Sequence, residues 1–124
     1  MAGLPPTARL RRAADFAALR HATGRFQAQH FALRWIVSPK GFARMGLAVS
    51  RKVSKRAVER NRIKRLLRES FRVQREALPP LDILVIARTS AAATDSSMLR
   101  ADIERAWHRL QALKPPSAPA TIGG

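Results

Sequence analysis

The side chains best suited to chemistry in this chain are basic, and they are concentrated in residues 51–75. That run holds 11 of the 24 Lys and Arg residues and only two acids, Glu59 and Glu69. Guanidinium groups bind phosphate through paired hydrogen bonds, and Asn61, which lies between two arginines, adds a donor and an acceptor. Helix faces usually balance such cations with acids, and this run does not. The run therefore predicts a polyanionic partner, of which nucleic acid is the most common.

The same run has the periodicity of an amphipathic helix with two distinct faces. The apolar face, which we expect to pack on the core, comprises Ile63, Leu66, Leu67, Ser70, Phe71, Gln74 and Ala77. The basic face, which we expect to follow phosphates, comprises Arg60, Asn61, Lys64, Arg65, Arg68, Arg72 and Arg75. Arg62 lies beside the apolar face, so we expect it to reach a neighbouring segment as well as RNA. Alternatively, the basic face is simply exposed to solvent and binds no partner.

The remaining reactive side chains do not assemble into a recognisable catalytic or metal-binding group. A nuclease that acts alone needs a general acid and base, or carboxylates that gather metal ions. The eight acids are scattered, and His21, His30 and His108 lack the spacing of metal ligands. There is no cysteine, which excludes disulfides, thiolate metal sites and cysteine nucleophiles. We therefore expect no catalytic residue, no metal site and no cofactor in the protein itself.

Length and charge indicate one strongly basic domain. The chain has 124 residues, which is the length of one domain. Its formal net charge is +16, and repulsion among these positive charges destabilises the folded protein unless an anion is bound. No stretch reaches the roughly 20 apolar residues of a membrane-spanning helix. The first residues lack a signal peptide's order of basic start, apolar middle and cleavage site. We expect a cytoplasmic protein without a membrane partner.

Periodicity and turn signals predict the elements that must position these side chains. A short amphipathic helix is expected over residues 9–21, ending before Gly24. Residues 30–37 and 45–49 are predicted to form an antiparallel hairpin, because a Ser-Pro-Lys-Gly turn signal separates them. The run 81–87 is almost entirely apolar and predicts a buried strand.

The last predicted element is an amphipathic helix that begins near Asp95 and ends at Leu113. Trp107 lies on its apolar stripe and is expected in the core. Together the elements predict an α+β fold, in which helices pack on a small mixed sheet. We divide the chain into a flexible N-terminal arm (1–8), a single RNA-binding domain (9–113) and a disordered tail (114–124).

Two segments resemble the signature of a known family. Residues 46–53 read GLAVSRKV, and residues 56–71 read RAVERNRIKRLLRESF, with a highly specific Arg-Asn-Arg segment at residues 60–62. These segments resemble the protein subunit of bacterial ribonuclease P. The resemblance extends outward in both directions and covers about residues 9–110.

The resemblance implies a fold and an activity. The fold has the order α-β-β-(β)-α-β-α, with the basic helix in a left-handed β-α-β crossover, against the general right-handed rule. The activity is that of ribonuclease P, in which a catalytic RNA that requires Mg²⁺ removes the 5′ leader from precursor tRNA. The protein assists this endonuclease by binding the leader and broadening the range of substrates. The implied partners are the catalytic RNA and the precursor tRNA leader, with no obligate protein partner.

The resemblance also implies which residues contact RNA. Those that match the surface facing the catalytic RNA are Arg51, Lys52, Lys55, Arg56, Arg60, Asn61, Arg62, Lys64, Arg65 and Arg68. Those that match the leader cleft are Phe16, Phe31 and Arg34. Arg20 stands where many members carry an aromatic residue, and Arg34 stands near a strand position that is often tyrosine. Guanidinium stacking or phosphate pairing is therefore expected to replace part of the aromatic stacking. Each of the two phenylalanines is alternatively a core residue.

Three other functions would share the basic charge. The first is an RNA-binding module of the ribosome or a chaperone, without a cleavage role. The second is a DNA-binding protein whose basic helix enters the major groove. The third is a membrane-surface helix, although the apolar face of the basic helix is better used against the buried strand. Magnesium-dependent cleavage of the leader, after mixing with the catalytic RNA, separates ribonuclease P from the first of these.

Overall fold

The computed structural model describes residues 5–10 and 12–113, which form an α+β fold with a four-stranded mixed sheet. The helices are α1 (Ala13–Ala18), α2 (Ala57–Gln74) and α3 (Ser96–Gln111). The strands are β1 (Gly24–Gln27), β2 (Phe31–Val37), β3 (Arg44–Ala48) and β4 (Leu81–Ala87). The order is α-β-β-β-α-β-α, which confirms the expected fold class. The additional strand that the resemblance implied is β1.

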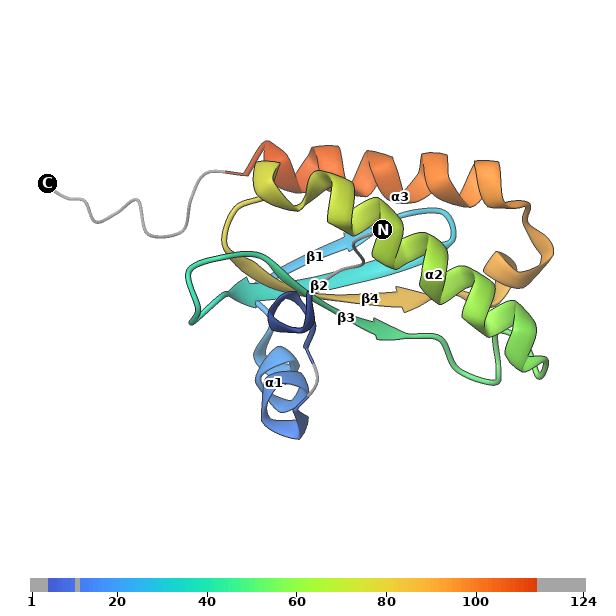
Figure 1. The fold of residues 1–124 in the computed structure, drawn as a ribbon, viewed down its shortest axis with the longest axis horizontal. Helices are drawn as coiled ribbons and strands as arrows, with labels where there is room; N and C mark the ends of the chain where they lie inside the picture. Colours follow the sequence, from blue (N-terminus) through green and yellow to red (C-terminus); the bar gives the residue numbers. More distant parts are fainter. Residues whose placement is uncertain (1–4, 11, 114–124) are drawn as a thin grey trace, which may run out of the picture.

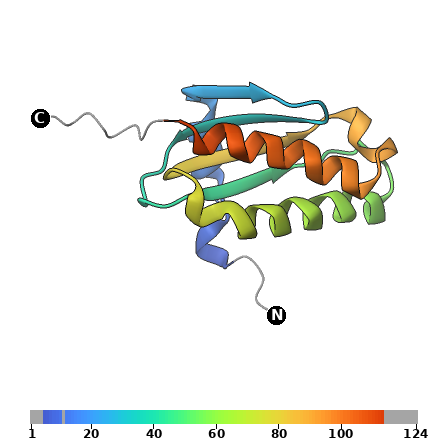
Figure 2. The ribbon, with the colours of Figure 1, turned by 90° about the horizontal axis from the view of Figure 1, so that it is seen from above.

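Two of these helices cover one face of the sheet, and the third lies on the other face. Figures 1 and 2 show α2 and α3 side by side on one side of the strands, with α1 on the opposite side. The alternation of β2 matches these layers, because Phe31 and Leu33 are buried in the core whereas Arg34 is exposed. We call the face of the sheet that carries Arg34 the open face.

The core between the sheet and the two long helices contains Trp107, as predicted. Its side chain is fully buried, and its ring centroid lies 5.6 Å from that of Phe71. The indole nitrogen donates a 2.8 Å hydrogen bond to the hydroxyl of Ser70. A buried tryptophan N–H needs such an acceptor, which explains why a serine occurs on the apolar face of α2.

The apolar face of α2 agrees with the prediction along the helix itself. Its buried residues are Ile63, Leu66, Leu67, Ser70 and Phe71. Ala77 is predicted on the same face but is exposed, so this part of the prediction is wrong. The helix ends at Gln74, and the 3-10 turn that follows over Arg75–Ala77 rotates Ala77 away from the core.

The strand order is β1-β2-β4-β3, which shows that the hairpin predicted between residues 30–37 and 45–49 is wrong. β4 lies between β2 and β3, antiparallel to the first and parallel to the second. The hairpin partner of β2 is β1, a strand of four residues that is too short to show a clear period. In this central position β4 is paired along both edges, and all of its side chains are buried or half-buried, as expected for a mostly apolar strand.

The parallel neighbours β3 and β4 are connected through α2. Parallel strands need a long crossover connection of this kind, because a tight turn can join only antiparallel strands. Figure 2 shows that the crossover lays the basic helix along the covered face of the sheet. The left hand that the resemblance implies for this crossover stays a prediction.

The C-terminal helix begins as predicted. Asp95 caps α3 by accepting a 2.9 Å hydrogen bond from the amide of Met98, and this bond lowers the pKa of the Asp95 carboxyl. The first helix is shorter than predicted, because α1 continues into a 3-10 turn over Leu19–His21. Within residues 5–10 and 12–113, no helix is long and apolar enough to cross a membrane.

The N-terminal segment packs against the edge strand β3. Ala8, which the prediction assigns to the flexible arm, is fully buried, and the next residue, Arg9, forms a parallel bridge with Met45. The end of the predicted arm is therefore part of the packed domain. Residues 1–4 of that arm, and the predicted tail over residues 114–124, lie outside the described residues.

Candidate nucleic-acid interface

The basic run begins in the loop that leads into α2. Four of the predicted contact residues precede the helix and are exposed: Arg51, Lys52, Lys55 and Arg56. Ser54 organises this loop, because its hydroxyl donates to Glu59 at 2.6 Å and accepts from the Arg56 amide at 3.1 Å. Glu59, one of the two acids in the run, therefore holds the start of the helix, and its carboxylate also lies 3.7 Å from the Arg56 guanidinium.

The two arginines of the Arg-Asn-Arg segment also bond to the protein. Arg60 donates to the carbonyl oxygen of Ser54 at 3.0 Å. Arg62 donates to the hydroxyl of Ser96 at 2.9 Å and to the carbonyl oxygen of Thr94 at 3.4 Å. This confirms that Arg62 reaches a neighbouring segment, here the start of α3. The asparagine between the two arginines is exposed.

The remaining basic side chains of α2 differ in how far acids offset them. Arg72 pairs with Glu69 one turn earlier, and this hydrogen bond lowers the pKa of the Glu69 carboxyl. Arg65 and Arg68 are exposed, and Lys64 is half-buried. The second acid of the run is thus engaged near the end of the helix, which leaves the middle of the basic face strongly cationic.

A groove of about 350 Å³ brings α1 and α2 together at the edge strand β3. The residues that line it, which we call the Phe16 groove, are Arg9, Leu10, Phe16, Met45, Gly46, Leu47, Lys64 and Arg68. Three cations from two parts of the chain therefore share one groove with an aromatic ring. Partial burial and the nearby charge of Arg9 lower the pKa of the Arg68 guanidinium, as expected where like charges gather.

The floor of the Phe16 groove is Gly46, which lets the Phe16 ring approach the sheet closely. A Cβ atom at residue 46 would lie 2.7 Å from Cε1 of Phe16, nearer than two carbon atoms normally approach. The neighbouring Asp15 holds α1 in place by accepting from the Arg12 amide at 3.4 Å and from the Arg44 guanidinium at 3.5 Å. The glycine of the family-like segment thus serves the packing of α1 on the sheet.

Arg34 lies on the open face, and Phe31 does not. Arg34 is exposed and stands opposite Arg25 of β1 and Leu84 of β4 in the strand register. Phe31 has no exposed surface and belongs to the core on the covered face of the sheet. The assignment of Phe31 to the leader cleft is therefore wrong, because alternation along a strand places residues 31 and 34 on opposite faces.

The buried carboxylates hold the fold. Asp82 accepts two hydrogen bonds from the Arg44 guanidinium, at 2.8 and 2.6 Å, and these bonds raise the pKa of Arg44. Asp102 accepts from the amides of Gln29 and His30 at 3.0 and 2.8 Å, which fixes the turn between β1 and β2. In the part of the chain that the structure describes, no group of three His or acidic side chains could hold a metal ion.

Arg9 and Gly46 line the Phe16 groove but are not among the predicted site residues. Arg9 reaches the groove through its bridge to Met45, a long-range pairing that periodicity cannot reveal. Gly46 carries a signal that could have been used, because a glycine inside an apolar strand often marks the close approach of another group.

Sequence comparison assigns the chain to a family. The family model described as Ribonuclease P matches residues 4–111. The ribonuclease P protein component of Chromohalobacter salexigens is 37% identical over 110 residues, which cover 88% of this chain and 86% of the relative. That of Thioalkalivibrio sulfidiphilus is 50% identical over 68 residues, which cover 55% of this chain and 57% of the relative.

Solved structures of the same family share the fold. The RNase P protein of Staphylococcus aureus is 29% identical with a TM-score of 0.74, covering 79% of this chain and 90% of that one. The RNase P protein of Thermotoga maritima is 27% identical with a TM-score of 0.71, and the match covers 86% of this chain and 97% of that one. Since the family model spans nearly the whole chain and a relative aligns over most of its length, the chain belongs to the ribonuclease P protein family.

Proposed function

We propose that this protein binds the catalytic RNA of ribonuclease P through α2 and the loop before it, and the 5′ leader of precursor tRNA through the Phe16 groove and the open face. In this proposal the RNA and its Mg²⁺ ions cleave the leader, and the protein supplies binding energy and a wider range of substrates. The complex works in the cytoplasm. The protein residues that meet the catalytic RNA are the exposed cations of residues 51–56 and the basic face of α2.

The observation that carries the proposal is the composition of the Phe16 groove. Proteins bind single-stranded RNA with aromatic rings on which bases stack and with cations that follow the phosphates. Phe16 offers such a ring, and Arg9, Lys64 and Arg68 offer the cations, all within one groove. Lys64 and Arg68 also belong to the basic face of α2, so the leader and the catalytic RNA would meet at the same edge of the sheet.

The open face extends this site across the strands. Arg34 and Arg25 stand directly opposite each other on antiparallel strands, where like charges repel. A leader phosphate near both guanidinium groups would offset this repulsion. This arrangement supports the expectation that phosphate pairing replaces aromatic stacking at residue 34.

Binding of this kind is largely electrostatic and has a measurable signature. Each phosphate contact releases counterions, so log affinity falls with log salt by about 0.7 per contact on a single strand and about 0.9 on a duplex. The exposed cations before α2 and along its basic face would provide several such contacts to the catalytic RNA. A steep salt dependence is therefore part of the proposal.

Reconstitution tests the proposed function directly. The full-length chain is mixed with a bacterial ribonuclease P RNA, and cleavage of precursor tRNA is followed at low Mg²⁺. We expect the protein to stimulate release of the leader at a single site. Arg65→Ala should reduce the stimulation, whereas Arg100→Ala, which removes an exposed charge from α3, should not. RNA binding without stimulation of cleavage would contradict the proposal and favour a ribosomal or chaperone-type module.

A further inference from the structure

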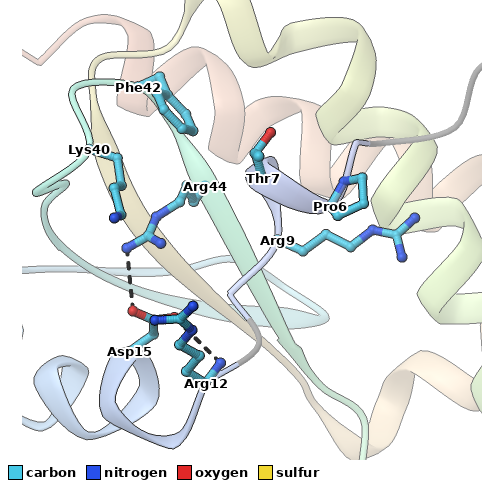
Figure 3. A pocket seen from close by; sticks show the side chains of 8 residues that line it. All are labelled: Pro6, Thr7, Arg9, Arg12, Asp15, Lys40, Phe42 and Arg44. Atoms are coloured by element: carbon cyan, nitrogen blue, oxygen red, sulfur yellow. Dashed lines mark hydrogen bonds and ion pairs between the residues drawn. The ribbon is translucent and has the colours of Figure 1, made fainter.

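A second hollow lies next to the Phe16 groove. Its volume of about 760 Å³ falls within the range of about 300–1,000 Å³ that is typical of small-ligand sites. The residues that line it, which we call the Phe42 hollow, are Pro6, Thr7, Arg9, Arg12, Asp15, Lys40, Phe42 and Arg44. Figure 3 shows that they come from the N-terminal segment, the start of α1, and β3 with the turn before it, and that the Arg9 side chain points away from Phe42 toward α2. Arg9 lines both the hollow and the Phe16 groove.

The Phe42 hollow has an excess of positive charge. Arg44 is offset by two carboxylates, because its guanidinium lies 2.6 Å from Asp82 and 3.5 Å from Asp15. The other cations of the lining form no ion pair within the described residues: Arg9, Arg12 and Lys40. These three cations outweigh the one carboxylate charge that Arg44 leaves unbalanced, so the hollow keeps a net positive charge that favours an anionic ligand.

Arg9 is held in place between the two sites. Its amide donates to the carbonyl oxygen of Pro6 at 3.1 Å, and the next amide donates to that of Met45 at 2.9 Å. The Nε of Arg9 is buried and has no hydrogen-bond partner among the described residues. A buried donor without an acceptor is unfavourable, and because a ligand cannot reach this buried atom, a phosphate would bind the terminal nitrogens of the same guanidinium.

Phe42 gives the hollow an aromatic surface that a simple phosphate site does not need. Its side chain is 37% exposed, although it is large and apolar. The guanidinium carbon of Arg75 lies over the ring, 5.9 Å from the centroid. A partly exposed ring beside cations is the arrangement on which proteins stack the bases of single strands.

We infer that the Phe42 hollow binds one nucleotide of a single-stranded RNA, with its base against Phe42 and its phosphate held by Arg12 and Lys40. The strand then passes Arg9 and enters the Phe16 groove, so the two sites are consecutive positions on one strand. This inference rests on the proposed function, because it takes the leader as that strand. An acidic peptide would match the cations but would leave the exposed ring unused.

The test measures the affinity of the full-length protein for single-stranded RNA by fluorescence anisotropy. Oligonucleotides of about four and about twelve nucleotides are compared, because the longer strand can span both sites and gain from their effective concentration. Phe42→Leu keeps an apolar side chain and changes no charge. It should weaken binding of the longer strand by about fivefold or more, the lower end of the loss expected for one stacking aromatic.

A second variant tests the phosphate contact independently. Lys40→Ala changes an exposed residue, and it should reduce the salt slope for the longer strand by about 0.7. Arg100→Ala, which removes one exposed charge from α3, is the matched control and should leave that slope unchanged. In both Phe42→Leu and Lys40→Ala, the higher affinity for the longer oligonucleotide than for the shorter one should largely disappear.

The outcomes separate this inference from the leader site itself. Wild-type affinity of both Phe42→Leu and Lys40→Ala for the longer strand overturns the inference, whatever Phe16→Ala does. A loss in those two variants with none in Phe16→Ala would support nucleotide binding in the hollow, but it would contradict the leader site and the passage of the strand into the Phe16 groove. Displacement of the longer strand by polyglutamate as readily as by RNA of equal charge would identify an acidic-peptide site and overturn the inference.

Discussion

The Phe16 ring fills the space above Gly46, where a Cβ atom would come within 2.7 Å of its Cε1. The side chain is half-buried, so its exposure is compatible both with packing and with stacking on RNA. Its neighbours favour the second role, because Lys64 and Arg68 bring two cations to the same groove. A ring needed only for packing does not require two cations in the same groove.

Phe16→Ala distinguishes the two roles. We expect it to weaken binding of precursor tRNA to the assembled enzyme by about 1–3 kcal/mol, the cost of losing one stacked base. Binding of mature tRNA should not change, because mature tRNA has no leader. Equilibrium binding of both tRNAs to the holoenzyme is the measurement, with Phe16→Leu as the control that keeps apolar bulk on Gly46. Equal losses for the two tRNAs would show that the ring only packs.

At the scale of the element, α2 divides its arginines between the fold and the surface. Arg62 joins α2 to the start of α3 through the Ser96 hydroxyl and the Thr94 carbonyl oxygen. Arg65, on the next turn, is exposed. Substitution of these two arginines should therefore have different effects on stability, although both lie in the basic run.

We expect Arg65→Ala to lower the affinity for the catalytic RNA and to reduce its salt slope by about 0.7–0.9, with no change in melting temperature. Arg62→Ala should lower the affinity and also the melting temperature, because each lost hydrogen bond contributes about 1 kcal/mol. Filter binding over a salt series and thermal unfolding measure the two effects, with Arg100→Ala as the charge control. Wild-type RNA affinity in Arg65→Ala would refute the proposed role of the basic face.

The elements that depend on local periodicity are predicted well from sequence, and those that depend on long-range pairing are not. The buried strand at residues 81–87, the apolar face of α2 and the cap at Asp95 all follow from side chains close together in the chain. The hairpin prediction fails because β4, which follows α2 in the chain, inserts between β2 and β3. No local pattern near the Ser-Pro-Lys-Gly turn reports that insertion.

The same distinction applies to the candidate site. The cations of α2 follow from spacing and from the family resemblance, and the structure places the exposed members on one helix. Phe31 is misassigned, although the sequence already indicated that it lies in the core. Phe31 and Leu33 are two residues apart on one strand, so their apolar side chains lie on the same face of the sheet. The position of Arg9 and the lining of the Phe42 hollow depend on segments that are distant in the sequence and meet only in the folded chain. Local sequence patterns therefore could not predict either of them.

Across the whole molecule, acids and cations are distributed unevenly. The net charge is +16, and the acids that the structure describes in ion pairs are mostly paired locally, as Glu69 is with Arg72, or buried, as Asp82 is with Arg44. The Phe16 groove and the Phe42 hollow therefore keep most of their positive charge. Repulsion within such a surface destabilises the free protein and makes its stability depend on bound anions.

Inorganic phosphate should raise the melting temperature of the free protein. An anion that binds only the folded state at 100 times its Kd stabilises by about 2.7 kcal/mol, a shift on the order of 10 °C for a domain of this size. Thermal unfolding in phosphate and in chloride at equal ionic strength measures the effect. Phosphate is also generally excluded from protein surfaces, so the comparison includes a Lys64→Ala/Lys40→Ala double variant. If phosphate acts by binding the two cationic sites, the shift should shrink in this variant; an undiminished shift would assign it to general exclusion and contradict the prediction.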